Sequence, residues 1–308
     1  MRVPSYYLKF KCIADRCRHS CCVGWEIDVD ERTLDRYRAL TGEIGDAIIQ
    51  TIEQGEGGAH FRLGEGERCP HLTKNGLCRI ITALGEGYLC DICREHPRFY
   101  NAVGGVWECG LGLACEEAAR VVLNSENYDE FVCFTDGDAE ITPETGGDFD
   151  AFAYRAALYA ELCEKSVPLK ARLGAINERY GLDATLSPTT HRALFAGLEY
   201  LNESNRALFE GTDRADFAPQ GALADACERF FAYLILRHAS PAECEADFAI
   251  AVSMAYELTR LFGALASAGD ADPADCARVI SEELEYSEEN TAAIRAALEN
   301  EKRGDAKG

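Results

Sequence analysis

The sequence lacks the features that direct a protein into or across a membrane. Its first twelve residues, MRVPSYYLKFKC, contain neither the apolar core nor the small-residue cleavage site of a secretory signal peptide. No later stretch reaches the roughly 18 consecutive apolar residues that a spanning helix needs. We therefore expect a cytoplasmic protein that has no membrane partner.

The sequence is also short of basic residues. Lys and Arg number 31 against 53 Asp and Glu, which gives a net charge of −22 at pH 7. Binding to DNA, RNA or anionic lipid without sequence preference needs a basic surface, so nucleic acid is not an expected partner. The acidity lies mainly beyond residue 120, where it either attracts a cationic protein substrate or only keeps the surface solvated.

Cysteine, in contrast, is abundant. A cytoplasmic protein keeps its thiols reduced, so 15 cysteines predict metal binding or catalysis rather than a disulfide framework. Ten of them lie within residues 1–115. The other five occur singly and are expected to act as small buried hydrophobic residues, namely Cys133, Cys163, Cys227, Cys244 and Cys276.

This distribution predicts an α+β protein with two domains. Residues 1–135 would form a small, cysteine-rich, metal-binding domain, and residues 149–300 an acidic, all-α helical bundle. The acidic, glycine-containing segment 136–148 is the expected linker between them.

Local patterns predict several elements of the first domain. Apolar and polar residues alternate over 25–29 as in a half-buried strand, and Asp30 is placed to cap a following helix. Asn75-Gly76 predicts a turn that brings Cys69 and Cys78 together, and residues 98–109 read as a hairpin around two glycines.

Helix-start signals recur in the second domain. Ser187, Ser240 and Asp272 each precede a proline and are predicted to cap helices. After Ser240, apolar residues repeat at spacings of three and four, which predicts one buried stripe. The stripe consists of Ile250, Met254, Leu258, Leu261 and Leu265.

Three groups of cysteines are candidates for metal ligands. The segments CPHLTKNGLC and CDIC resemble the two hooks of a tetrahedral zinc site, and CIADRCRHSCC adds four more thiols than one zinc can use. More than one zinc, a polynuclear centre or an iron–sulfur cluster would use them, whereas the alternative is reduced thiols that fill core space. Neighbouring side chains in extended backbone point in opposite directions, so Cys21 and Cys22 are not expected to share one ion. The histidines that could replace a thiolate, or could be ordinary hydrogen-bonded residues, are His19, His71 and His96.

Four blocks of the sequence, YYLKFKCIADRCRHSCCVGWEIDVD, CPHLTKNGLCRI, YLCDICREHPRFYN and LACEEAARVVL, occur in this order between about residues 5 and 123. They resemble the flagellin lysine-N-methylase family and its cysteine-rich zinc- or iron-chelating domain. The resemblance implies S-adenosylmethionine-dependent methylation of exposed lysines on a protein substrate, flagellin, and an iron–sulfur cluster of the [4Fe-4S] type, with zinc as the alternative metal. It leaves out Cys109 and implies as ligands Cys12, Cys17, Cys21, Cys22, Cys69, Cys78, Cys90, Cys93 and Cys115.

No familiar S-adenosylmethionine motif accompanies these blocks. The run ECGLGLA from Glu108 is close to the glycine-rich loop of Rossmann-like methyltransferases, but helices follow it where alternating strands are required. We expect a hairpin strand that leads into a helix instead. The spacing of Cys12, Cys17 and Cys21 also departs from the CxxxCxxC signature of radical S-adenosylmethionine enzymes. Any pocket for this cofactor would therefore be of neither kind.

Methyl transfer also needs a lysine amine without its proton, and a carboxylate or tyrosinate near the cysteines could assist. The candidates, each of which could instead be a structural hydrogen-bonding group, are Tyr6, Tyr7, Asp28, Asp30 and Asp91. Trp25 or Trp107 could contact the sulfonium through a cation–π interaction. The alternative function is a non-enzymatic adaptor in which zinc or iron stabilises a module whose helical domain binds a partner.

Overall fold

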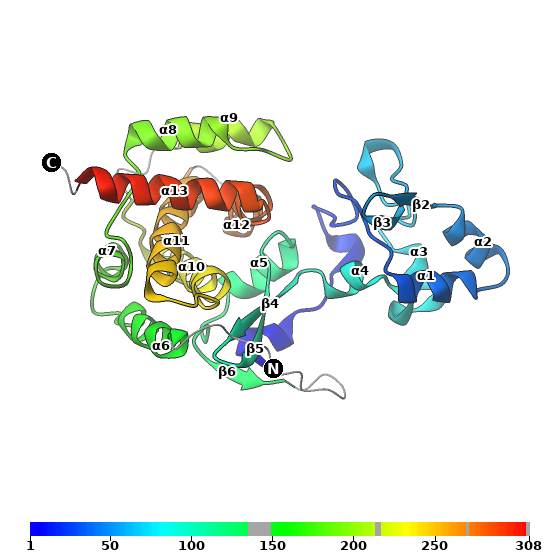
Figure 1. Cartoon of the computed structure of the whole chain (residues 1–308), viewed down its shortest axis with the longest axis horizontal. Helices are drawn as coiled ribbons and strands as arrows, with labels where there is room; N and C mark the ends of the chain where they lie inside the picture. The colour runs from blue at the N-terminus through cyan, green and yellow to red at the C-terminus, as the bar shows by residue number, and fades with distance from the viewer. Residues whose placement is uncertain (135–148, 213–216, 269–270, 306–308) are drawn as a thin grey trace. The chain divides into compact units, whose positions relative to one another are not determined.

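The structure is a computed structural model that describes residues 1–134, 149–212, 217–268 and 271–305. It is mixed α/β and divides into two compact units (Figure 1). The helical unit comprises Met1–Phe10, Phe99–Ala114 and Ala118–Gly308. The cysteine unit comprises Lys11–Arg98 together with the three residues Cys115–Glu117.

A four-stranded sheet lies in the part of the chain that forms the helical unit. The strand order is β4-β5-β1-β6, with β1 (Arg2–Pro4) parallel to β5 (Val106–Leu111) and antiparallel to β6 (Phe131–Cys133). β4 (Arg98–Val103) and β5 form the predicted hairpin. Gly104 and Gly105 connect them with φ of +52° and +76°, a conformation that glycine adopts without steric cost.

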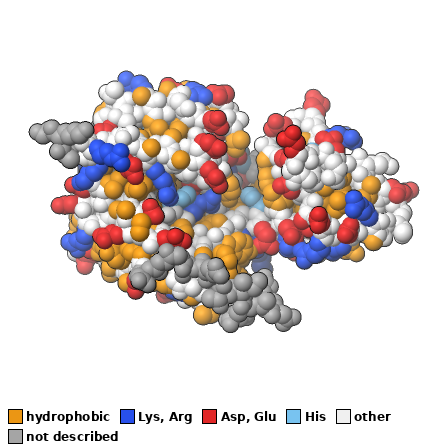
Figure 2. All heavy atoms as spheres, viewed as in Figure 1, with side chains coloured by type: hydrophobic (Ala, Val, Ile, Leu, Met, Phe, Trp, Pro, Cys, Tyr) orange, Lys and Arg blue, Asp and Glu red, His pale blue; other side chains and the backbone are white. Residues whose placement is uncertain are grey.

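Helices make up the rest of the helical unit. They are α5 (Glu116–Leu123, whose first two residues belong to the cysteine unit), α6 (Ala151–Leu162), α7 (Leu169–Tyr180), α8 (Pro188–Gly197), α9 (Ser204–Glu210), α10 (Gly221–Leu234), α11 (Glu245–Ala266), α12 (Pro273–Ile280) and α13 (Glu288–Asp305). α11 is central and packs against α7, α10, α12 and α13. On the face drawn in Figure 2, acidic and basic side chains are intermixed over these helices.

The buried character of α11 explains its composition. Four residues of the predicted stripe are buried, Ile250 is half-buried, and Phe248, Val252 and Phe262 on the other sides of the helix are buried too. By length and hydropathy α11 could cross a membrane, yet 72% of its most apolar window is buried inside the protein. Such burial is typical of a core helix that is covered all round.

Two of the three predicted helix caps are confirmed. The Ser187 hydroxyl accepts a bond from the amide of Thr190, and Asp272 accepts one from Ala274, with proline in the first turn of each helix. The prediction for Ser240 is wrong, because α11 begins at Glu245 instead. The buried Ser240 hydroxyl accepts a hydrogen bond from Arg155 and donates one to the carbonyl of Ile235, so tertiary contacts override its local signal.

The cysteine unit consists of short elements around a small core. They are α1 (Glu31–Arg38), α2 (Glu43–Ile49), the hairpin β2 (Ile52–Gly55) and β3 (Gly58–Phe61), α3 (Arg79–Leu84) and α4 (Asp91–Glu95). Asp30 caps α1 as predicted, since its carboxylate accepts the amide of Thr33 at 2.9 Å. The regular strand predicted over residues 25–29 is wrong: this segment makes only isolated contacts with β3, although Ile27 and Val29 are buried as the alternation indicates.

The two units differ from the domains expected at residues 1–135 and 149–300. The sheet and most of α5 group with the helices, and the segment 136–148 lies outside the described residues. Long-range contacts account for this grouping. Arg155 of α6 makes two hydrogen bonds to the buried Glu108 of β5, and the Asn101 side chain donates to the carbonyl of Leu236. The cysteine and charge distribution, on which the expected domain boundaries were based, does not predict such long-range pairings.

Candidate metal and substrate site

All nine cysteines implied as metal ligands lie in the cysteine unit. Cys109, which the resemblance leaves out, is buried in β5 of the helical unit. The structure thus brings together, in one compact unit, thiols that are up to 103 positions apart, from Cys12 to Cys115.

Five of these thiols share the hydrophobic core of the unit. We call them the core cysteine group: Cys22, Cys69, Cys78, Cys90 and Cys93. The amide of Cys69 donates to the carbonyl of Cys22 at 2.8 Å, and a β-bridge joins Leu72 to Cys78 across the predicted turn. Cys78 directly precedes α3 and Cys90 directly precedes α4, so short local elements set the positions of four sulfurs.

Backbone amides are directed at two of these sulfurs. Burial raises the pKa of the Cys69 thiol to about 12, and hydrogen bonds from the amides of His71 and Leu72 oppose this rise. Burial likewise raises the pKa of Cys78, opposed by the amides of Ile81 and Ile80 in the first turn of α3. Such N–H···S bonds stabilise a thiolate, which is the form that binds a metal. Burial nevertheless outweighs these amides, so the pKa of both thiols stays above its usual value in the protein without metal.

The CDIC segment contains a coupled thiol pair. A hydrogen bond from Cys93 lowers the pKa of Cys90 and outweighs the effect of burial, while the same bond raises the pKa of Cys93. The hydroxyl oxygen of Tyr37 lies 3.6 Å from the Cys90 sulfur. The hydrogen bond therefore shifts the pKa values of the two thiols in opposite directions.

The other four cysteines of the nine are exposed or half-buried, and we call them the surface cysteine group: Cys12, Cys17, Cys21 and Cys115. The pKa of Cys21 is raised first by its hydrogen bond with Cys22, then by burial and by the charge of Cys22, and after these by the nearby thiols of Cys115 and Cys12. Cys22 also contributes to the raised pKa of Cys69, Cys78 and Cys93. The adjacent thiols of Cys21 and Cys22 therefore interact most strongly with each other, and each also lies near further thiols of the unit.

A buried carboxylate holds Cys115 beside the N-terminal cysteine loop. Glu116 is 1% exposed and accepts hydrogen bonds from the amide of Arg18 at 2.8 Å, from Nε of Arg18 at 3.1 Å and from the amide of His19 at 3.3 Å. Arg18 follows Cys17 and Glu116 follows Cys115, so this interaction fixes the backbone next to both thiols. The sequence analysis did not identify Glu116. The one local feature that could have drawn attention to it is its position directly after a cysteine, at the start of a helix.

The structure gives none of the three histidines a metal-binding arrangement. His71 is buried, its Nε2 lies 3.0 Å from the Thr51 hydroxyl and its ring packs on Phe61. His96 Nε2 is buried without a hydrogen-bond partner in the described residues, and its ring lies 6.1 Å from that of Trp25. Burial lowers the pKa of His71 and of His96 to about 4, and His19 is exposed.

Within the described residues, no three His, Cys, Asp or Glu side chains converge closely enough to enclose a metal ion. The donor set nevertheless fits a thiolate-bound metal by its chemistry, because nine thiols and directed amides are gathered in one small unit. The ligating sulfurs would have to move closer together around a bound metal.

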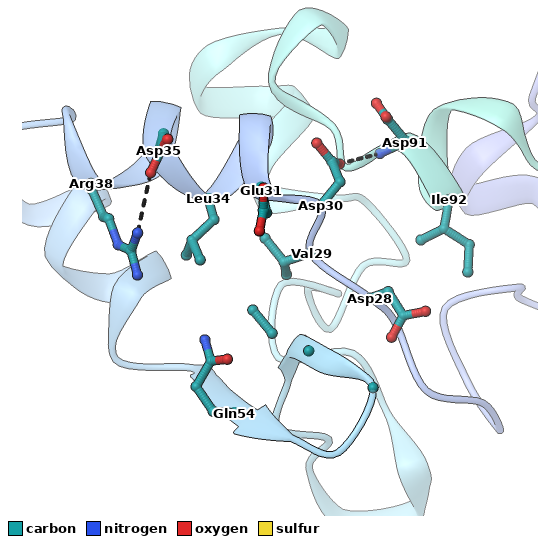
Figure 3. A pocket seen from close by; sticks show the side chains of 13 residues that line it. Asp28, Val29, Asp30, Glu31, Leu34, Asp35, Arg38, Gln54, Asp91 and Ile92 are labelled. Carbon is teal, nitrogen blue, oxygen red and sulfur yellow. Dashed lines mark hydrogen bonds and ion pairs between the residues drawn. The ribbon is translucent and has the colours of Figure 1, made fainter.

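An acidic cavity of about 920 Å³ opens on the same unit (Figure 3). It lies among α1, the β2–β3 hairpin and the start of α4, next to Cys90. Its charged lining residues are Asp28, Asp30, Glu31, Asp35, Arg38 and Asp91. A net acidic lining suits a cationic ligand.

Most of these carboxylates already have partners. Asp30 caps α1 and also accepts the amide of Asp91 at 2.9 Å, so it links the starts of two helices (Figure 3). Asp91 pairs with Arg32 and Arg94, and Asp35 pairs with Arg38. Asp28 and Glu31 have no ion-pair partner among the described side chains, which leaves them available to a ligand.

The remaining candidates lie elsewhere or are engaged. Tyr6 and Tyr7 are buried in the helical unit, where burial raises the pKa of Tyr6 well above its usual value. Trp107 also belongs to the helical unit, whereas Trp25 of the cysteine unit donates its indole N–H to the carbonyl of Cys21 at 2.5 Å. The run from Glu108 forms strand β5 and leads into α5, as expected for a hairpin strand rather than a glycine-rich cofactor loop.

The fold and the site together define a mixed α/β protein with a cysteine-rich unit that carries an acidic cavity. This chain is 31% identical over 134 residues to flagellar biosynthetic protein FliU of Salmonella muenchen, and the match covers 39% of this chain and 75% of FliU. The chain therefore belongs to the family of FliU and the related flagellin lysine methylases.

Two lysine-N-methylases, from Salmonella typhimurium strain LT2 and Salmonella choleraesuis strain SC-B67, show the same identity over the same length. The match spans 32% of each of these relatives, about a third of their length. No family model matches the chain, and no solved structure matches it.

Proposed function

We propose that the protein transfers methyl groups from S-adenosylmethionine to exposed lysine ε-amines of a protein substrate, with flagellin as the first candidate. Its cysteine unit would hold an iron–sulfur cluster of the [4Fe-4S] type, or zinc, through the nine thiols. The names of the lysine-N-methylases and of FliU support the reaction class and the substrate.

The observation that carries the proposal is the position of the acidic cavity. Asp91 and Ile92 of α4 line it, while Cys90 and Cys93 lie on the same short segment within the core cysteine group. Asp30, which also lines the cavity, contributes to the electrostatic environment of the Cys90 sulfur. A lysine side chain in the cavity would therefore approach the region where the thiols gather.

The available residues would bind and orient this lysine. Asp28 and Glu31 would attract its ammonium group, whose pKa in solution is about 10.4. After the ammonium loses a proton to water, the nitrogen lone pair attacks the methyl carbon, the carbon–sulfur bond breaks and S-adenosylhomocysteine leaves. A bound iron–sulfur cluster would supply an iron that can ligate the amino and carboxylate groups of S-adenosylmethionine.

The test is methyl transfer by anaerobically purified protein. Incubation with S-adenosylmethionine and flagellin from the source organism should add methyl masses to lysines, as read by mass spectrometry. The double variant Asp28→Asn/Glu31→Gln should lower kcat/KM for flagellin about tenfold, or about 1.4 kcal/mol, because two attractive charges are removed.

The control is Glu43→Gln, which removes an exposed carboxylate of the same unit outside the cavity. It should methylate like the unaltered protein, and metal content should be equal in all three proteins. Metal-loaded protein that methylates neither flagellin nor any protein of a cell lysate would favour the adaptor function instead.

A further inference from the structure

The β2–β3 hairpin of the cysteine unit has one covered edge and one open edge. Within the described residues, β3 is the one strand that pairs with β2. The far edge of β3 is covered by residues 27–29: the carbonyl of Ala59 accepts the amide of Val29, and the amide of Phe61 donates to a carbonyl of the same segment. The far edge of β2 has no such neighbour in the described part of the chain.

The pairing of the hairpin determines which groups of β2 point to its open edge. In an antiparallel pair, residues that bond each other alternate with residues whose N–H and C=O point outward. Ala59 and Phe61 bond outward, so the residues that face them across the hairpin point outward as well. These residues of β2 are Ile52, which is half-buried, and Gln54, which is exposed. Two amides and two carbonyls are therefore directed to the side where a further strand could pair.

Gln54 connects this edge to the acidic cavity. Gln54 and the facing Ala59 lie on one side of the hairpin, and both line the cavity between that side and α1. In Figure 3 the Gln54 side chain points from the hairpin toward Glu31 and Leu34 of α1. A residue opposite Gln54 on an added strand would lie on the same side, with its Cβ about 4.5–5.5 Å from that of Gln54. Its side chain would therefore enter the cavity.

We propose that the protein substrate docks as an extended strand along the open edge of β2, with its target lysine opposite Gln54. Main-chain bonds to the edge supply affinity and the cavity selects the side chain, as in other cases of strand addition. The charges favour lysine there, because five carboxylates and a single guanidinium line the cavity. The inference rests on the proposed function, since it states the form in which the substrate lysine enters the cavity.

The experiment measures binding of a short flagellin peptide, centred on a lysine, to the full-length protein by fluorescence anisotropy. Gln54→Pro removes the outward amide and no bond of the hairpin, and proline is tolerated at such an edge position. It should weaken binding about fivefold through the loss of one hydrogen bond. Gln54→Thr is the matched control: it also loses the glutamine side chain but keeps the amide, and it should bind like the unaltered protein.

Peptide variants test the docking without changing the protein. N-methylation of one peptide amide at a time should weaken binding at every second residue, because alternate amides of an added strand face β2. Amide hydrogen exchange, read by NMR, should slow at Ile52 and Gln54 when the peptide binds. Exchange at Glu53, whose amide faces β3, should not change.

The outcomes separate this inference from the proposed function. Flagellin methylation combined with no peptide binding, or with binding that shows neither the alternation nor the slower exchange, would overturn the inference alone. Equal losses in Gln54→Pro and Gln54→Thr would also overturn it. Peptide binding with the expected alternation but without methylation would support the docking surface and overturn the proposed methyl transfer. Absence of both binding and methylation would overturn the two together.

Discussion

Asp30 shows how a single residue can be predicted correctly in one role and remain a candidate for another. Its carboxylate accepts amides from Thr33 and Asp91, and these bonds outweigh burial and hold the pKa of Asp30 below its usual value. A carboxylate with two structural donors has little capacity left for a substrate. We therefore assign Asp30 to the architecture of the cavity and Asp28 and Glu31 to its ligand.

Substitutions of Asp30 distinguish its structural role as a helix cap from a catalytic role. Asp30→Ala should reduce the free energy of unfolding by about 0.5–2 kcal/mol through loss of the α1 cap, whereas Asp30→Asn should keep most of it because asparagine also caps helices. Urea denaturation of both variants, with Asp35→Asn as a control at an exposed position, gives the measurement. Asp30→Asn should also methylate normally; a selective loss of kcat in that stable variant would make Asp30 a catalytic group.

At the scale of elements, two π-helical turns in the helical unit place charged groups in its interior. Residues Ile235–Ala239 follow α10, and Ser281–Glu285 follow α12. The buried Glu285 accepts hydrogen bonds from Tyr233 and His238, both at 2.9 Å, and lies 3.3 Å from Nε of Arg237. Burial lowers the pKa of His238, against the opposing effect of Glu285, and the charges of Arg237 and Arg295 act in the same direction as burial.

This arrangement predicts a pH dependence of stability. Because the unfolded chain binds a proton on histidine near pH 6.5 and folded His238 binds it only at lower pH, stability is complete above that range and falls as the pH decreases below it. His238→Gln should lose less unfolding free energy than the unaltered protein between pH 7.5 and 5.5 in urea titrations. Equal slopes for the two proteins would show that His238 is not buried in its neutral form.

At this scale, the features that depend on nearby residues could be predicted from the sequence, and the features that depend on tertiary contacts could not. The turn at Gly76, the hairpin at Gly104 and the caps at Ser187 and Asp272 depend on residues within a few positions, and the structure confirms them. Ser240 failed because Arg155 engages its hydroxyl. In the site, the family resemblance implied nine cysteines that the structure places in one unit, and their role as ligands stays a prediction. Glu116 and the cavity depend on contacts between segments that no spacing reveals.

At the scale of the whole molecule, the two units are stabilised in different ways. The helical unit has a large aromatic core that includes Phe230, Phe231, Phe248 and Phe262, whereas five sulfurs occupy the small core of the cysteine unit. When a small unit binds a metal, the binding energy becomes folding energy. Under the proposed metal binding, only the cysteine unit should depend on metal for its stability.

Calorimetry of the metal-loaded protein should show two unfolding transitions. A chelator should shift the transition of the cysteine unit down by 10 °C or more, because a small unit loses a large part of its stability with each kcal/mol, at about 4–8 °C per kcal/mol. The other transition should stay in place. Hydrogen exchange read by mass spectrometry assigns each transition to its unit; one transition that moves as a whole would mean that both units unfold together.

The discontinuity of the cysteine unit also sets an order of events during synthesis. The core cysteine group is complete once Cys93 has left the ribosome, but the surface cysteine group must wait for Cys115 and Glu116. Strand β1 cannot complete its pairing until later, because its partners β5 and β6 end at Leu111 and Cys133. The core cysteines are therefore synthesised before Cys115, and the sheet can close only after all nine cysteines have emerged.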